Sequence, residues 1–143
     1  MREALQEAGK AQKEGEVPVG AIVVGRSHEI VARDHNRCIS LTDPTAHAEI
    51  LAIRHAAKIL DNYRLNQTTI FVTIEPCPMC MGAILNARIE RLVFGAFDEK
   101  FGASGLINDL ADDTKIHHKL QVIPGIMQEE CKQIMQDFFK ERR

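Results

Sequence analysis

Two short segments with metal-binding side chains constrain the fold and chemistry of this chain more than any other feature. They are Thr45-Ala46-His47-Ala48-Glu49 and Glu75-Pro76-Cys77-Pro78-Met79-Cys80. Zinc binds imidazole nitrogen and thiolate sulfur. The two cysteines are three residues apart at the predicted start of a helix, so both sulfurs can face one point, and a helix N-terminus favours thiolate over thiol. The pattern therefore predicts that His47, Cys77 and Cys80 bind one zinc ion.

Three protein ligands would leave the fourth zinc position to water, which is typical of catalytic zinc. The pKa of zinc-bound water is about 7 instead of about 15.7, so hydroxide is available near neutral pH. Glu49 lies two residues after His47, and residues two apart on a helix do not share a face. We therefore expect Glu49 beside the metal-bound water, as the residue that moves protons, and not on the metal.

Other interpretations of these residues are open at this point. A fourth ligand, Cys38 or Cys131, would close the site and make the zinc structural. A redox-active Cys-x-x-Cys is a further alternative, although it gives no role to His47 or Glu49. Glu49 taken alone fits an exposed acid in the first turn of a helix, where acids are favoured.

Size and composition predict one globular domain, residues 1–143, because 45% of its residues are hydrophobic and 27% are charged. No apolar run approaches the roughly 18 to 20 residues that span a bilayer. The N-terminus lacks the pattern of a signal peptide. We therefore expect a cytoplasmic protein without a membrane partner. The net charge of −2 gives no general support for nucleic-acid binding, so an RNA site would need a local basic patch, and DNA is not expected.

Hydrophobic patterns predict strands that alternate with helices, and hence an α/β fold with a mixed central sheet covered by helices. The expected strands are 17–25, 29–34, 68–74, 91–95 and 120–123, the first two forming an antiparallel pair. The expected helices are 4–14, 46–60, 78–87 and 128–142. Their expected buried faces are Leu5, Ala8 and Ala11 in the first, Ile50, Ile53, Ala57 and Leu60 in the second, and Cys131, Ile134, Met135, Phe138 and Phe139 in the last. The other histidines, 28, 35, 55, 117 and 118, are expected in loops or on the surface.

The combined pattern His-x-Glu and Pro-Cys-x-x-Cys is similar to the signature of zinc nucleobase deaminases. Most of the chain resembles one branch of them, the bacterial-type tRNA-specific adenosine deaminases. The resembling segments are Glu16-Val17-Pro18-Val19-Gly20-Ala21, His35-Asn36-Arg37, Asp43 to Ile50, Asn62-Tyr63-Arg64-Leu65, Glu75 to Cys80, Val93-Phe94-Gly95-Ala96, the positions Asp98, Lys100, Gly102, Ala103 and Gly105, and Phe138-Phe139.

The resemblance implies a cytidine-deaminase-like three-layer α/β/α sandwich and a homodimer. It implies a hydrolase that converts adenosine to inosine at the wobble position of tRNA, with zinc activating the water and Glu49 carrying protons. It also implies that Asn36 hydrogen-bonds the flipped base and that Asp98 lies near the flanking nucleotides. The expected partner is a tRNA anticodon loop, where the base is already single-stranded.

The sequence leaves alternatives for the substrate and for several roles. A free nucleobase or nucleoside, such as guanine or cytosine, is favoured by the slightly acidic charge, and a non-catalytic zinc-stabilised RNA-binding or assembly subunit is a third hypothesis. Asn36 could be a turn-forming loop residue, and Asp98 could cap a turn. Phe97 and Phe101 could stack on loop bases or be buried.

Overall fold

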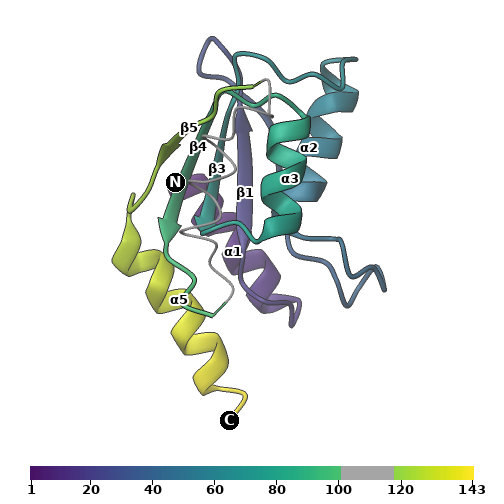
Figure 1. Ribbon diagram of the computed structural model, residues 1–143. Helices are drawn as coiled ribbons and strands as arrows, with labels where there is room; N and C mark the ends of the chain where they lie inside the picture. Colours follow the sequence, from purple (N-terminus) through teal and green to yellow (C-terminus); the bar gives the residue numbers. More distant parts are fainter. Residues whose placement is uncertain (101–117) are drawn as a thin grey trace.

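The computed structural model describes residues 1–100 and 118–143 and contains a five-stranded mixed sheet with the strand order β2-β1-β3-β4-β5 (Figure 1). The strands are β1 (Gly20–Val24), β2 (Ile30–His35), β3 (Thr69–Ile74), β4 (Arg91–Ala96) and β5 (Gln121–Ile123). β1 pairs antiparallel with β2 and with β3, whereas β3, β4 and β5 are parallel. All five predicted strands and the antiparallel first pair are confirmed. The first strand begins later than expected, at Gly20, because Pro18 has no N–H to donate to a sheet.

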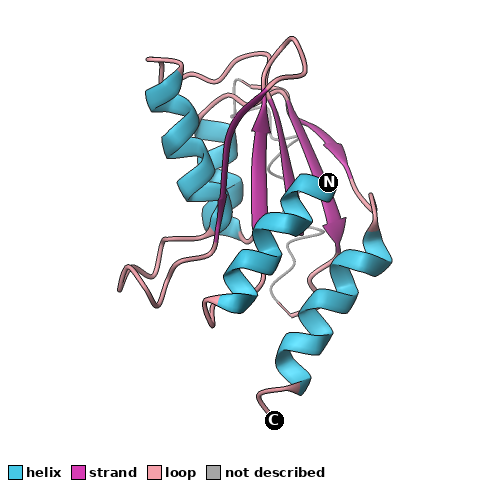
Figure 2. Cartoon of the chain, turned by 180° about the vertical axis from the view of Figure 1, so that it is seen from behind, coloured by secondary structure: helices cyan, strands magenta, loops and turns pink. Residues whose placement is uncertain are grey.

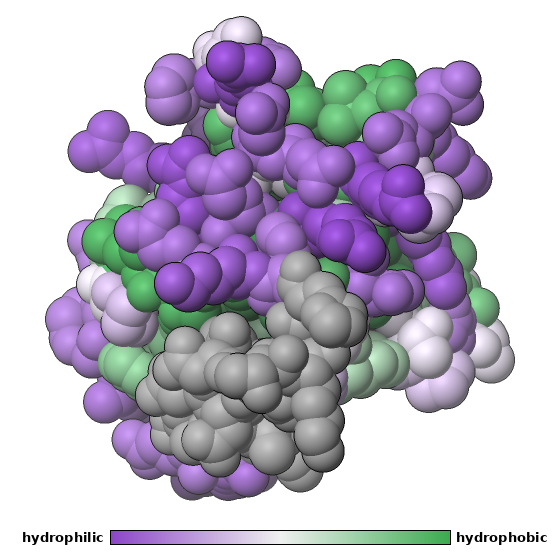
Figure 3. Space-filling view, turned by 45° about the horizontal axis from the view of Figure 1, so that its top comes forward, coloured by the Kyte–Doolittle hydropathy of each residue, from purple (hydrophilic) through white to green (hydrophobic). Residues whose placement is uncertain are grey.

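Helices cover both faces of this sheet, as Figures 1 and 2 show from opposite sides. α2 (Ala48–Ile59) and α3 (Pro78–Asn86) lie on one face, and α1 (Arg2–Lys13) and α5 (Gln128–Lys140) lie on the other. The predicted three-layer α/β/α arrangement is therefore confirmed. In the described parts of the chain, no helix is long and apolar enough to cross a membrane. On the face shown in Figure 3, the coloured surface is mostly hydrophilic, with hydrophobic side chains in scattered patches.

The face of α2 that packs on the sheet includes a stripe of alanines and differs from the expected face at Leu60. Ala48, Ala52 and Ala56 are fully buried, whereas Leu60 is 44% exposed. These alanines are four residues apart, so they form one stripe along the helix. Small side chains let the helix axis approach the sheet closely. Of the expected residues, Ile50 is buried and Ile53 and Ala57 are partly buried against the core. The expected face is therefore confirmed in part, and Leu60 is the exception.

The opposite layer is packed closely at two glycines. A Cβ atom at Gly20 would overlap the Ala4 carbonyl oxygen of α1, and one at Gly95 would overlap the Cys131 sulfur of α5. Within α5, Cys131 and Phe138 are buried as expected, but Phe139 is 47% exposed. The expected stripe of α5 is therefore confirmed only in part.

The buried face of α1 includes a carboxylate that the sequence did not reveal. Ala4, Glu7, Ala8 and Ala11 are buried, and Leu5, which we expected there, is only partly covered. The Glu7 Oε2 atom lies 3.0 Å from Nδ1 of His35, and the Glu14 Oε2 atom lies 3.0 Å from Nε2 of the same ring. His35 is 2% exposed, so its expected surface position was wrong. Its ring joins α1 to the end of β2.

Candidate metal centre and active site

The two predicted metal-binding segments meet where the N-termini of α2 and α3 lie side by side. His47 is the N-cap of α2 and Cys77 is the N-cap of α3, and both have extended backbone angles. Pro78 occupies the first turn of α3, a position where its missing N–H costs nothing. Cys77 follows the carboxyl end of β3 closely, which is where ligands bind in open α/β sheets. The expected location of the metal segments is therefore what the structure shows.

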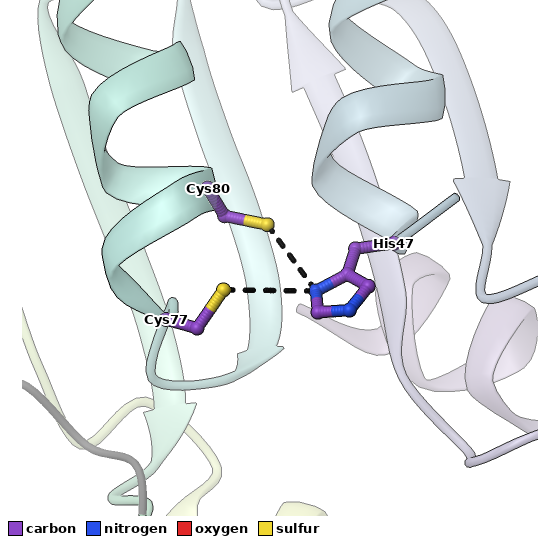
Figure 4. A group of neighbouring side chains, drawn as sticks. All are labelled: His47, Cys77 and Cys80. Atoms are coloured by element: carbon purple, nitrogen blue, oxygen red, sulfur yellow. Dashed lines mark hydrogen bonds between the residues drawn. The ribbon is translucent and has the colours of Figure 1, made fainter. Parts of the chain in front are cut away.

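The three predicted ligand atoms point toward one another (Figure 4). The Nδ1 atom of His47 lies 3.7 Å from the Cys77 sulfur and 3.4 Å from the Cys80 sulfur. The three ligand atoms all lie within 4.8 Å of one another. Tetrahedral zinc, with bonds of about 2.3 Å to sulfur and about 2.0 Å to nitrogen, separates these atoms by about 3.5 Å. The donor types and their spacing fit a zinc ion without rearrangement.

The alternative of a closed structural site finds no support in the positions of the other cysteines. Within residues 1–100 and 118–143, no fourth His, Cys, Asp or Glu joins the group of His47, Cys77 and Cys80. Cys131 packs on α5 against Gly95, on the other face of the sheet. A group of three protein ligands leaves a coordination position for water.

The two cysteines share a proton in a way that favours metal binding. A hydrogen bond from Cys80 lowers the pKa of Cys77 to about 4, with a further contribution from His47. The same hydrogen bond, and then burial, raise the pKa of Cys80. Cys77, at the positive end of the α3 dipole, is therefore the more acidic thiol of the pair. A cation placed between the two sulfurs would favour removal of the second proton.

Glu49 lies in the first turn of α2 and is 2% exposed. Burial raises the pKa of its carboxyl group to about 7. The exposed-acid alternative is therefore wrong for this residue. A buried carboxyl with such a pKa can accept and return a proton near neutral pH.

Asn36 lies directly after β2, beside the start of α2. Its backbone N–H donates to the Val19 carbonyl at 3.1 Å, and its Oδ1 accepts the Ala48 N–H at 2.8 Å. Asn36 thus satisfies one of the free N–H groups at the N-terminus of α2. In the sequence analysis, only the resemblance to the deaminase family indicated that Asn36 belongs to the site. The structure brings it next to the metal segment and adds a structural role.

Asp98 follows the carboxyl end of β4, and its backbone is held by the segment that precedes Cys77. Its N–H donates to Glu75 Oε2 at 3.1 Å, and its Oδ1 accepts the Lys100 N–H at 2.9 Å. The turn-capping interaction considered from the sequence is therefore present. Phe97 is 47% exposed, with its ring edge-on to Phe94 at 5.2 Å, so it is not a core residue.

Several positions named from the sequence lie outside the described residues. They are Phe101, Gly102, Ala103, Gly105 and His117.

Sequence reasoning missed two buried glutamates near these segments, Glu16 and Glu75, which are 2% and 3% exposed. Glu16 accepts hydrogen bonds from the backbone of Ile39 and Ser40. Burial raises the pKa of Glu75, which holds Asp98. Each is an acid one or two residues before a proline, in Glu75-Pro76 and Glu16-Val17-Pro18. That local pattern is the signal that could have found them.

A groove of about 570 Å³ lies away from this centre. It is lined by residues near the amino ends of β3 and β4, including Thr69, Phe71 and Arg91, and by none of the predicted site residues. The ligand geometry, and not the size of a groove, therefore locates the candidate active site.

Comparison with known proteins agrees with this geometry. The model of the MafB19-like deaminase family matches residues 1–143. The tRNA-specific adenosine deaminase of Haemophilus influenzae is 51% identical over all of this chain and 83% of its own length, and that of Bacillus subtilis is 46% identical over all of this chain and 88% of its own length. A solved structure from a study of A-to-I editing by tRNA:A34 deaminases is 42% identical, with a TM-score of 0.87 over 94% of this chain and 96% of that chain. The chain therefore belongs to the MafB19-like deaminase family and, within it, to the tRNA-specific adenosine deaminases.

Proposed function

We propose that this protein hydrolyses adenosine to inosine at the wobble position of tRNA, with zinc held by His47, Cys77 and Cys80. The observation that carries the proposal is the zinc-compatible spacing of these three ligand atoms beside a buried glutamate, Glu49. The similarity to tRNA-specific adenosine deaminases over the whole chain supports the choice of substrate.

Glu49 is the residue proposed to move protons. Zinc, when bound, would supply a water activated for attack on an amine-bearing carbon of the base. The Glu49 carboxylate would accept one proton from that water and donate it to the adenine ring nitrogen beside the reacting carbon. It would then take the remaining proton from the oxygen added to that carbon and donate it to the amine, which leaves as ammonia. A pKa of about 7 allows each transfer near neutral pH. Burial excludes bulk water from the carboxyl group.

Asn36 and Asp98 are the residues proposed to contact the substrate. The Oδ1 atom of Asn36 is engaged by the start of α2, which fixes the amide plane and leaves the amide nitrogen as the donor to an unstacked adenine. Asp98 lies one residue beyond the exposed Phe97 at the end of β4, and would contact a flanking nucleotide. An anticodon loop offers such unstacked nucleotides without the cost of opening a duplex.

The test is incubation of zinc-loaded protein with an adenosine-bearing anticodon stem-loop, followed by nucleoside mass spectrometry. We expect inosine from the wild type and a loss of roughly 10²- to 10⁴-fold in rate for Glu49→Ala, the usual contribution of a general acid–base residue. Glu3→Ala, which changes a half-exposed glutamate paired with Arg33, is the matched control and should retain the wild-type rate.

Parallel incubations with guanine, cytosine and free adenosine address the alternative substrates. Turnover of a free base with no inosine in RNA would replace the proposal by the free-base hypothesis. Absence of any turnover by a zinc-loaded single chain would favour the non-catalytic subunit.

We further propose that the protein acts in the cytoplasm, where tRNA is its partner, and that it works as a homodimer. Sedimentation velocity at micromolar concentration should give a mass twice the 16.0 kDa of one chain. A single species of monomer mass at that concentration would refute the dimer.

A further inference from the structure

Glu16 is a buried carboxylate whose contacts lie in a loop beside the candidate active site. It is 2% exposed. Its Oε1 accepts the N–H groups of Ile39 at 2.9 Å and Ser40 at 2.8 Å, and its Oε2 lies 3.2 Å from the Ile39 N–H. Burying a carboxylate is costly unless such donors replace water. Glu16 and the loop backbone therefore stabilise each other.

The loop that Glu16 holds, residues 37–43, lies in the chain between Asn36 and the proposed metal ligand His47. The two ends of the loop are held by bonds that do not involve Glu16. The Arg37 N–H donates to the Ala46 carbonyl at 3.0 Å, and Asn36 is bonded to Val19 and Ala48. Glu16 thus fixes the outer part of the loop, while other bonds fix the metal ligand.

The outer part of the loop presents apolar side chains to solvent. Ile39 is 73% exposed and Leu41 is 51% exposed. Because hydrogen bonds to a buried carboxylate already fix the backbone of this loop, a contact made by these side chains would not pay the cost of ordering the loop. The loop directly follows Asn36, the residue proposed to bind the target base, and Asn36 is bonded to the start of α2 beside His47. The occupant that this position favours is therefore the substrate.

We propose that Glu16 is a positioning residue that holds loop 37–43 so that Ile39 and Leu41 contact unpaired nucleotides next to the target adenosine. The inference rests on the proposed function. Glu16 contributes through substrate affinity and does not touch the metal or Glu49. Loss of its carboxylate should therefore raise KM for the stem-loop while kcat and zinc content stay close to the wild-type values.

The test compares Glu16→Gln with the surface variant Ile39→Ser/Leu41→Ser, using Glu3→Gln as the control. An amide at position 16 places a donor against one of the loop N–H groups. We expect both test variants to raise KM about tenfold with kcat within about twofold, which corresponds to about 1.4 kcal/mol of binding. Amide hydrogen exchange at Ile39 and Ser40 should accelerate in Glu16→Gln only, and zinc should stay at one ion per chain.

Three outcomes would overturn the inference. One is an unchanged KM in the surface variant, which keeps Glu16 and the core intact. Another is a fall in kcat or in zinc content for Glu16→Gln without a rise in KM, because that is the result of a merely structural residue. The third is a loss of dimer mass in sedimentation velocity that accounts for the KM change, which would assign the loop to a second copy of the chain. Failure of the wild type to form inosine is a separate result and would refute the proposed function itself.

Discussion

At the scale of single residues, the candidate site depends on where a few side chains point. His47 and Cys77 occupy N-cap positions, and Cys80 lies in the first turn of α3. A cap residue has non-helical backbone angles, so its side chain leaves the helix axis and can reach a neighbouring element. Because two helices begin side by side, three ligands from two distant segments converge on one point.

Phe97 is the residue whose role the sequence left most open. Its ring is half exposed and held edge-on by the buried Phe94, and stacking of a base on an aromatic ring contributes about 1 to 3 kcal/mol. We predict that Phe97→Leu raises KM for the anticodon stem-loop about fivefold or more, with kcat unchanged. Steady-state kinetics measure this, and Tyr63→Leu, which removes an aromatic ring 70% exposed beyond the far end of α2, serves as the control. Equal KM values for the wild type and Phe97→Leu would show that no base stacks there.

At the scale of elements, the start of α2 depends on a side chain from outside the helix. Asn36 Oδ1 accepts the N–H of Ala48, the first residue of α2, and so satisfies one of the free N–H groups of the first turn. His47, the N-cap residue, makes no side-chain capping bond to its own helix. His47 is therefore free to turn its Nδ1 toward the cysteines. Asn36 thus stabilises the start of α2 from outside the helix, and the His47 side chain is left available for its proposed role as a zinc ligand.

Substitutions at Asn36 should separate its two roles. Asn36→Ala removes the acceptor and should lower the free energy of unfolding by about 1 kcal/mol, as loss of a helix cap does. Asn36→Asp keeps the acceptor at the positive end of α2 and should retain most of that stability. Both variants lack the amide donor and should raise KM for the stem-loop. Urea unfolding and kinetics measure the two effects, and a fully active Asn36→Asp would exclude the amide donor from base binding.

The attachment of α1 to β2 should depend on pH. Burial alone would raise the pKa of Glu7, but hydrogen bonds from Lys10 and His35 outweigh it and lower the pKa below the ordinary value of 4.5. A carboxyl group with a lowered folded-state pKa stabilises the fold above the unfolded pKa, and this contribution is lost as pH falls through the folded value.

We therefore predict that Glu7→Gln is less stable than the wild type at pH 6 and that the difference shrinks as pH falls below about 4.5. Urea unfolding at pH 3.5 to 6 tests this, and Glu3→Gln should show a much smaller pH-dependent difference. A difference that stays constant across this range would mean that the Glu7 charge does not contribute.

At the scale of the whole molecule, a zinc ion bound by His47, Cys77 and Cys80 should link the start of α2 to the start of α3 and so stabilise the fold. A ligand that binds only the folded state stabilises it by about 2.7 kcal/mol at a free concentration 100 times its Kd. We predict that chelator-treated protein unfolds at lower urea concentration and regains its midpoint with one equivalent of zinc. Cys80→Ser should show no such response to zinc. A wild-type midpoint that is the same with and without zinc would contradict a metal bound to the folded chain.

The sequence by itself determined the elements and the chemistry. Period-2 and period-3.6 patterns located five strands and four helices, since local burial sets them, and His47, Glu49, Cys77 and Cys80 stood out because zinc accepts few donor types. Only the tertiary structure decided which faces were buried and which polar groups were paired. In α2, Ala52 is buried and Leu60 is exposed, because small side chains allow the helix to pack closely on the sheet. His35, Glu16 and Glu75 are buried because hydrogen-bond partners distant in sequence satisfy their polar atoms. Such pairings connect residues up to 28 positions apart, and local periodicity carries no information about them.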